Sequence, residues 1–406
     1  MSLTLSKNKV WTFYKWCLFI VMLESLKVWF FWDLPVKFMI PLLFIPLAIV
    51  GVFLIPNFFS FRKKSVLIIV LLYLLSVLFG TRGNLNAYIG VLISTGGVLF
   101  FAGLKDNYKK DFLVFFTRFF AVLVGISLLG WILFLLGVNL PSFYDSFGFS
   151  DNRAEAQYQY QNYYVFLYNI GTRYSDLTQV LIPRFSSILL EPGYFGIVLV
   201  ILLYLNHFNL KDKFNIILLV ALIFTFSLSG WLMGLITYVA YYLRFSNKKI
   251  ITLISVIIFL WAFYAFFSSY NNGANAVNEL ILSRLEYDES KGTISGYNRT
   301  QESFDDWFET YFITSPDIFF GLDMYKVFGE TTNVGWKVYM VNYGLVGLSL
   351  YLLFLFYPFY RYRNYEKFVF FFLYILIFAR GHHVIYFAAF PILYLGGCAI
   401  LKNQNR

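Results

Sequence analysis

The sequence predicts an all-α, polytopic integral membrane protein with about 12 transmembrane helices and two large external loops. Three observations predict this class. First, 59% of the 406 residues are hydrophobic and only 13% are charged, whereas a soluble domain has roughly 25% charged residues. Second, the apolar runs continue for about 20 residues, the length that a bilayer-spanning helix needs. Third, the runs do not alternate apolar and polar residues over about ten positions, as outer-membrane barrel strands do. A soluble or disordered chain is therefore excluded.

Twelve apolar ranges are the predicted spans, and we expect the whole chain to form one transmembrane domain. The first range carries Lys15, Glu24 and Lys27 and is too long for a cleaved signal peptide, so we expect it to be retained. The ranges are about 10–31, 36–55, 65–81, 86–104, 112–138, 188–206, 214–229, 231–244, 250–268, 337–358, 367–380 and 383–401.

The loops between these ranges differ strongly in charge. One alternate set of loops, together with the two termini, carries 18 of the 32 Lys and Arg residues, and the short turns of the other set carry two, Arg82 and Arg380. The positive-inside rule therefore places both termini in the cytoplasm. Since topology explains the net charge of +10, we expect no nucleic-acid partner. Cys17 and Cys398 then lie toward the reducing side of the membrane, so both are expected to be free thiols.

Two long loops, 139–187 and 269–336, fall on the outer side, and loops of such length are usually functional. In the first, a hairpin with its turn near 169–172 is predicted. The second holds eleven acidic and four basic residues. Its stretch NRTQESFDDWFETYF places aromatic residues at helical spacing after Asn298, a candidate cap. We expect this amphipathic helix to lie on the membrane with its aromatic face down.

The stretch RFSSILLEPGYFG at 184–196 begins at the end of the first long loop. Its predicted course places Arg184 at the membrane surface and Glu191 inside the sixth span. A carboxylate there is costly and marks a functional site by default. The alternative is that Glu191 pairs with an arginine and holds helices together. Pro192 removes one backbone hydrogen bond, and Gly196 allows a helix or ligand to come close.

Several arginines are predicted on the outer side, and such a cluster beside a bilayer suits a lipid-linked phosphate or pyrophosphate. A guanidinium group binds phosphate oxygens as a fork and stays charged. The alternative is that some of these residues balance the acidic residues of the second loop. The candidates are Arg184, Arg284, Arg299 and Arg380.

The remaining candidates are histidines and tyrosines. His382 and His383 share a short outer turn. They could exchange a proton or simply end a helix, but without a third ligand they predict no metal site. Tyr164 and Tyr194 could contact sugar rings, although loop tyrosines also anchor proteins at the membrane interface. The chain has no Walker loop, dinucleotide fingerprint or zinc spacing, so no cofactor is expected.

Three motifs together resemble the O-antigen and capsule repeat-unit polymerases, the Wzy family, which is related to the O-antigen ligases. The first is RFSSILLEPGYFG at 184–196. The second is FSLSGWLMGLI at 226–236, similar to the serine-and-glycine break between two spans of the family. The third is FFGLDMYKVFGETTNVGWKVYMVNYGLVGLSLY at 319–351, similar to the family's loop end and the Gly-x-x-Gly start of the next span. The resemblance covers most of the chain.

The resemblance implies a GT-C-like membrane glycosyltransferase of the bacterial inner membrane that needs no metal. It would transfer a glycan from undecaprenyl pyrophosphate to another lipid-linked repeat unit at the outer face, in lipopolysaccharide or capsule biosynthesis. A chain-length regulator and a flippase are the implied partners. Arg184, Arg299 and Glu191 would then be catalytic, with His382 or His383 as other candidates for the base.

Two alternatives remain open. The ligase relatives usually carry a histidine near the end of the second loop, and the matching stretch 331–336 has none, which favours a polymerase. A lipid-linked oligosaccharide flippase or transporter would often show two similar halves, and the sequence shows no internal repeat.

The predicted orientation can be tested by labelling single cysteines from outside intact cells with a thiol reagent that does not cross the membrane. We expect Ser146→Cys and Ser290→Cys to react, because both positions lie in the long outer loops. Ser65→Cys and Ser246→Cys should not react in intact cells, because both belong to the basic, cytoplasmic set of loops. Labelling of either of the last two in intact cells would overturn the orientation.

Overall fold

The structure is a computed structural model of the chain. It is mostly helical, and each of the twelve predicted ranges contains a helix. Among the described residues, the helices α6, α11 and α15 are long and apolar enough to cross a bilayer, and several shorter helices are also apolar. The all-α, membrane-protein prediction is confirmed at this level, while the number of spans stays a prediction. The described residues are 7–32, 39–61, 63–79, 85–145, 160–169, 184–245, 249–289, 293–295, 300–322, 327, 335–361, 364–381 and 387–401.

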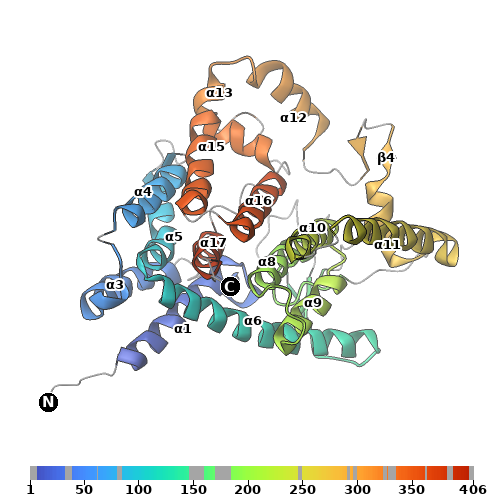
Figure 1. The fold of residues 1–406 in the computed structure, drawn as a ribbon, viewed down its shortest axis with the longest axis horizontal. Coiled ribbons are helices and arrows are strands. Elements are labelled where there is room, and N and C mark those ends of the chain that lie inside the picture. Colours follow the sequence, from blue (N-terminus) through green and yellow to red (C-terminus); the bar gives the residue numbers. More distant parts are fainter. Residues whose placement is uncertain are drawn as a thin grey trace. The chain divides into compact units, whose positions relative to one another are not determined.

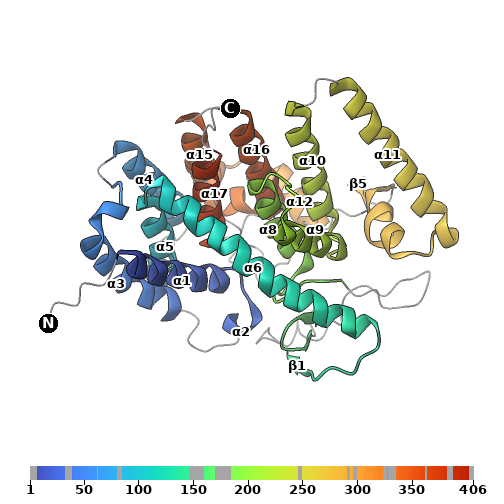
Figure 2. The same ribbon diagram turned by 60° about the horizontal axis from the view of Figure 1, so that its bottom comes forward.

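The chain forms two compact units, and α6 (Asp106–Leu135), an unbroken helix in Figure 2, contributes to both. Other helices of the first unit (Figure 1) are α1 (Lys7–Ser25), α3 (Met39–Leu54), α4 (Lys64–Leu78), α5 (Leu85–Gly103), α12 (Glu302–Trp307), α13 (Asp317–Phe320), α15 (Trp336–Arg361), α16 (Tyr365–Arg380) and α17 (Ala389–Ile400). The second unit adds α2 (Trp29–Trp32), α8 (Pro192–Leu205), α9 (Lys213–Phe224), α10 (Leu228–Phe245), α11 (Lys249–Ser269) and the strands β1 (Phe143–Asp145), β2 (Tyr160–Asn162), β3 (Leu167–Asn169), β4 (Tyr287–Asp288) and β5 (Thr293–Ile294).

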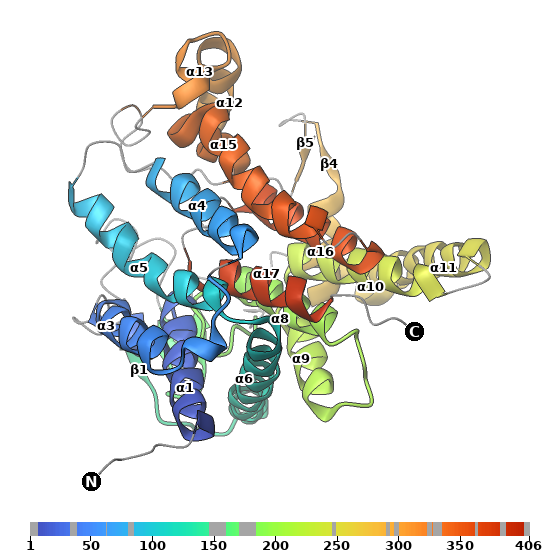
Figure 3. The same ribbon diagram turned by 60° about the vertical axis from the view of Figure 1, so that its left-hand side comes forward.

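The first unit is organised around α15, which packs against α4 and α13 (Figure 3). This helix is interrupted at Gly344, whose φ of 63° and ψ of −173° are not helical. The end of α13 lies against the interruption, because a Cβ atom on Gly344 would come within 2.5 Å of the Phe320 backbone nitrogen. The Leu322 N–H donates a hydrogen bond to the Val341 carbonyl. Backbone from the second loop therefore occupies the break in a candidate membrane span.

The predicted amphipathic helix of the second loop exists, but its location was predicted wrongly. It begins at Glu302 as α12 and continues as a π-helical turn over Phe308–Phe312. Its aromatic face does not lie on a membrane: Phe304, Phe308 and Phe312 are buried in one cluster with residues of α15. Burying three rings in a protein core satisfies the same hydrophobic demand as a bilayer does. The predicted cap, Asn298, lies outside the described residues and is not the cap, because the N-cap residue of α12 is Gln301.

The second unit is built around α8, of which every residue is buried. Helix α10 packs closely on it, since a Cβ atom on Gly230 would lie 3.3 Å from the Gly196 Cα. Small residues at a crossing let two backbones approach in a way typical of membrane helices. The expectation that Gly196 permits a close approach is thus confirmed.

The hairpin of the first loop forms at a different place from the predicted turn. β2 pairs with β3 and also with β1, giving an antiparallel sheet of order β1-β2-β3. The hairpin turn is at 163–166, where Asn162 Oδ1 accepts a hydrogen bond from the Tyr164 N–H and Tyr164 has a φ of 65°. An Asn that bonds the backbone two residues later is a turn signal that the prediction overlooked. The predicted turn lies almost wholly outside the described residues.

Two other expectations concern the ends of the chain. The first predicted span, 10–31, is interrupted: α1 ends at Ser25, Lys27 has a φ of 54°, and Val28 forms a β-bridge with Leu189. The backbone at Val28 therefore pairs with a strand-like residue of the second unit instead of continuing α1. Cys17 and Cys398 are both free thiols, as expected.

Helix α11 has the most apolar exposed surface of the candidate spans. None of its most hydrophobic stretch is buried, and Ile250, Phe259 and Trp261 are each more than 60% exposed. Apolar patches of this size mark contact with a membrane or with another protein.

The break at Gly344 predicts a specific loss of stability. Gly344→Ala should cost about 1–3 kcal/mol from the backbone conformation alone, because φ 63° with ψ −173° is a region adopted almost only by glycine, and the overlap with the backbone of α13 should add to this. Gly137→Ala is the matched control, because Gly137 also has a positive φ of 78° but nothing lies within 4 Å of its added Cβ. We expect the midpoint of thermal aggregation in detergent to fall further for Gly344→Ala. Equal falls would show that the contact with α13 is unimportant.

Candidate functional site

The segment Arg184–Leu190 is an irregular stretch of backbone in the second unit, and Phe185–Leu190 are all buried. Three neighbouring parts of the chain form hydrogen bonds with backbone groups of this segment. The Phe185 N–H donates to the Phe224 carbonyl (2.9 Å) at the end of α9. The Ser187 carbonyl accepts from Leu167 of β3 (2.9 Å), and the Ile188 carbonyl accepts from Trp29 of α2 (3.1 Å). Irregular backbone is tolerated among apolar side chains only when its polar groups are paired in this way.

The location of Glu191 differs from the prediction. It lies before the helix rather than inside a span: α8 begins at Pro192, and Glu191 is its N-cap residue, with φ −129° and ψ 124°. The side chain is exposed and makes no capping hydrogen bond. The physical reason is Pro192, which favours the first position of a helix and restrains the preceding residue to extended backbone. The carboxylate is therefore accessible at the positive end of a buried helix.

The junction between α9 and α10 is a second irregular point, as the FSLSG motif predicts. Ser227 Oγ accepts a hydrogen bond from the Gly230 N–H (3.2 Å), which is the arrangement of a helix N-cap. Phe226 has a φ of 43°. Trp231 Nε1 donates to the Leu222 carbonyl (3.0 Å) and so satisfies one carbonyl at the end of α9. The two helix ends are thus fixed by the side chains of the motif itself.

Two of the predicted arginines are carried by segments that meet at this junction. Arg184 Nε donates a hydrogen bond to the Thr225 carbonyl (3.1 Å). Arg284 follows Leu280–Leu282, whose buried side chains pack against Phe226 and Leu228. Both arginines are partly buried. Arg184 itself therefore contacts this turn, and the segment that carries Arg284 packs against it.

The tyrosines of the first loop divide into exposed and buried members. Tyr164 is 56% exposed at the tip of the hairpin, with its ring in edge contact with Phe143. Tyr163 stacks on Phe166, and burial, with a smaller effect of Tyr144, raises the pKa of its phenol, so it stays protonated at neutral pH. Tyr194 is buried one turn into α8. Tyr164 and Tyr144, the latter 74% exposed, are the accessible rings among these tyrosines, and an accessible ring suits a sugar.

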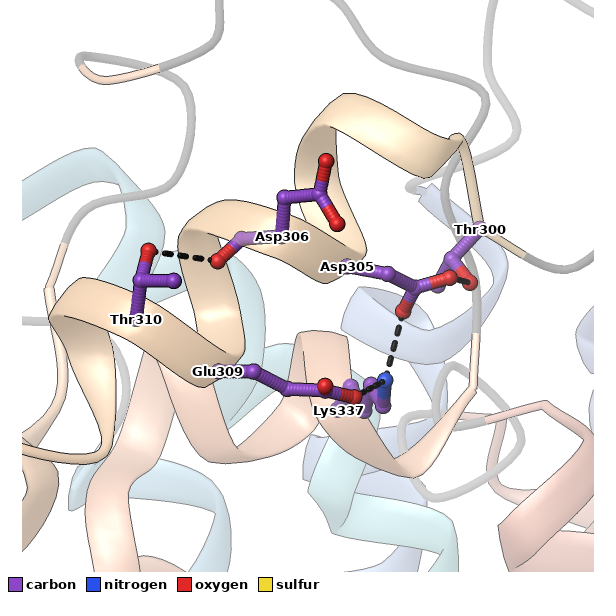
Figure 4. Close-up of polar contacts among 6 residues, drawn as sticks. All are labelled: Thr300, Asp305, Asp306, Glu309, Thr310 and Lys337. Carbon is purple, nitrogen blue, oxygen red and sulfur yellow. Dashed lines mark hydrogen bonds and ion pairs between the residues drawn. The ribbon is translucent and has the colours of Figure 1, made fainter.

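A charged cluster in the first unit was missed by the sequence analysis (Figure 4). Lys337 Nζ, at the start of α15, binds Asp305 Oδ1 at 2.6 Å and Glu309 Oε1 at 3.1 Å. Thr300 Oγ1 donates to the other oxygen of Asp305. Asp306, the next residue, is exposed. Lys337 lies 32 positions from Asp305 and 28 from Glu309 along the chain, so no local pattern could have revealed the pairing.

Of the other predicted site residues, the structure describes only Arg380. Arg380 is the last residue of α16 in the first unit and is partly buried. Arg299, His382 and His383 lie outside the described residues, so the four-arginine cluster and the base remain predictions. Among the described residues, no group of three His, Cys, Asp or Glu side chains could hold a metal ion.

The cluster around Lys337 predicts different effects for two neighbouring carboxylates. Asp305→Asn should loosen the loop helix from α15 and leave Glu309 as the remaining charged partner. For a partly exposed pair we expect a cost of about 1 kcal/mol, which corresponds to about fivefold faster chymotrypsin cleavage between 300 and 336 when local opening is rapid. Asp306→Asn is the matched control and should cleave at the parental rate. Cleavage sites are read by mass spectrometry, and equal rates for the two variants would contradict the role of the ion pair.

Comparison with known proteins gives no family assignment. No protein-family model matches the chain, no curated protein is similar to it, and no solved structure matches it. The resemblance to the repeat-unit polymerases therefore rests on the three motifs and on the order of the apolar ranges and loops.

Proposed function

We propose that the protein is a polysaccharide polymerase. It would transfer a glycan from undecaprenyl pyrophosphate to the end of another lipid-linked repeat unit at the outer face of the bacterial inner membrane. The single observation that carries the proposal is the pair of groups at the two ends of the 184–191 segment. A partly buried arginine is held at one end, and an accessible carboxylate stands before a buried helix at the other.

This arrangement supports a group transfer that needs a stabilised leaving group and a proton acceptor. The acceptor hydroxyl attacks the anomeric carbon of the donor, and the bond to the pyrophosphate oxygen breaks. The electron pair leaves with the pyrophosphate, where Arg184 and Arg284 stabilise the negative charge. The hydroxyl proton goes to Glu191, or to His382 or His383. Tyr164 offers an exposed ring and a hydroxyl to the glycan.

The glycan made by cells that lack the protein distinguishes the proposed class from its alternatives. A polymerase defect leaves single repeat units attached to their acceptor. A ligase defect leaves long polymer that is not attached, and a flippase defect traps lipid-linked units in the cytoplasm. Either of the last two results would overturn the proposal.

Arg184 is expected to be required for polymer formation. Both Arg184→Ala and Arg184→Lys should reduce the rate on the order of a hundredfold, because a lysine replaces the planar fork by a point charge. Polymer length on a gel is normalised to the amount of membrane-inserted protein.

Glu191→Gln keeps the shape of the side chain and removes its charge. Cells with this variant should make no polymer although the amount of the protein in the membrane is normal.

Arg118→Ala is the matched control, since Arg118 is an exposed arginine on α6. It should keep the parental activity per molecule. If Arg184 serves only to tie the segment to α9 through the Thr225 carbonyl, its variants lower the amount of folded protein while activity per molecule stays constant. That result would remove Arg184 from the site.

A further inference from the structure

The first unit contains a basic cavity that the proposed reaction does not use. Its volume is about 500 Å³, and it is lined by Val52, Pro56, Asn57, Phe59, Ser60, Phe61, Lys63 and Lys105. Both lysine side chains are exposed. Within the described part of the chain, neither has an ion-pair partner. The cavity therefore presents two cations and two small polar side chains beside apolar walls.

Backbone pairing brings the two lysines together from different loops. Phe59 and Leu104 form an antiparallel bridge. The Lys105 N–H donates to the Phe58 carbonyl (2.8 Å), and the Ser60 N–H donates to the Gly103 carbonyl (2.8 Å). Lys63 directly precedes α4, and Lys105 directly precedes α6. The N-terminus of a helix carries a partial positive charge, so each lysine charge lies next to a second, smaller positive charge. Asp106 follows Lys105 in the chain but does not line the cavity.

The cavity adjoins an apolar surface that suits acyl chains. Val52, near the end of α3, and Pro56, in the turn that follows it, form part of its wall. On the neighbouring positions of the same helix, Phe53 is 78% exposed and Leu54 is 66% exposed. The charge asymmetry of the loops predicts that this end of α3 faces the cytoplasm, where membrane lipids are anionic.

From this combination we propose that the cavity binds the phosphate headgroup of an anionic membrane lipid, with the acyl chains along α3. Lys63 and Lys105 bind the phosphate oxygens, while Asn57 and Ser60 supply hydrogen bonds to the headgroup. Basic pockets between membrane helices are known to select anionic headgroups in this way. The proposal is independent of the polymerase reaction.

The test uses the purified full-length protein in a neutral detergent and native mass spectrometry to titrate bound phosphatidylglycerol and phosphatidylcholine. The parent should bind phosphatidylglycerol more tightly than phosphatidylcholine. Removing one lysine should weaken binding of phosphatidylglycerol about fivefold, and Lys63→Ala/Lys105→Ala about twenty- to thirtyfold. Lys211→Ala/Lys249→Ala is the matched control, because it removes the same charge from exposed positions of the second unit.

Equal weakening in the two double variants would show a diffuse attraction by surface charge and would overturn the site. Unchanged binding in the cavity variant would do the same. If inorganic phosphate at millimolar concentration displaces phosphatidylglycerol completely, the cavity is a site for free phosphate rather than for a lipid. Lys105→Gln alone keeps the test valid if the double variant does not fold, as judged by size-exclusion chromatography.

Discussion

The structure depends on one constraint: polar backbone groups surrounded by apolar side chains must find partners within the protein. An α-helix satisfies this demand by itself, but the stretch from Arg184 to Leu190 is not helical, and all of it after Arg184 is buried. Its N–H and C=O groups are paired instead with α2, β3 and the end of α9. Each backbone group left without a hydrogen bond in such apolar surroundings would cost about 2–7 kcal/mol. The segment is consequently fixed by three separate elements. Arg184 and Glu191, at its two ends, are therefore attached to a rigid backbone.

The same constraint explains why other irregular points carry side-chain or backbone partners. At the α9–α10 junction the partners are the Ser227 hydroxyl and the Trp231 indole. At Gly344 the partner is the backbone of the second loop, and only a residue without Cβ permits the approach. A rigid frame of this kind suits a site that must stabilise developing charge, because its dipoles need no reorganisation during the reaction.

The sequence predicted those parts of the fold that depend on local composition. Apolar runs of sufficient length predicted helices, and the structure has a helix in every predicted range. The Ser and Gly residues of FSLSG predicted the break between α9 and α10. The sequence did not predict where Glu191 would lie, because the apolar run continues across the Glu-Pro pair and gives no sign of where α8 begins.

The location of the second-loop helix was also not predictable from the sequence, because an aromatic face fits a membrane and a protein core equally well. The Lys337 ion pair joins residues far apart in the chain, so only tertiary structure reveals it. That the segments carrying Arg184 and Arg284 both reach the α9–α10 turn likewise depends on packing, whereas their common outer position is a prediction from loop charge.

The break in α15 also has a consequence for the order in which the protein is made. Phe319 and Phe320, which lie against Gly344, precede it by about 25 residues and therefore leave the ribosome first. The chain that completes the break has thus been synthesised before α15 forms, and the Leu322 N–H is already available to the carbonyl of Val341. If the end of the second loop were deleted, the nascent helix would reach the lipid with that carbonyl bare. The cost would then arise during biogenesis, before the mature fold exists.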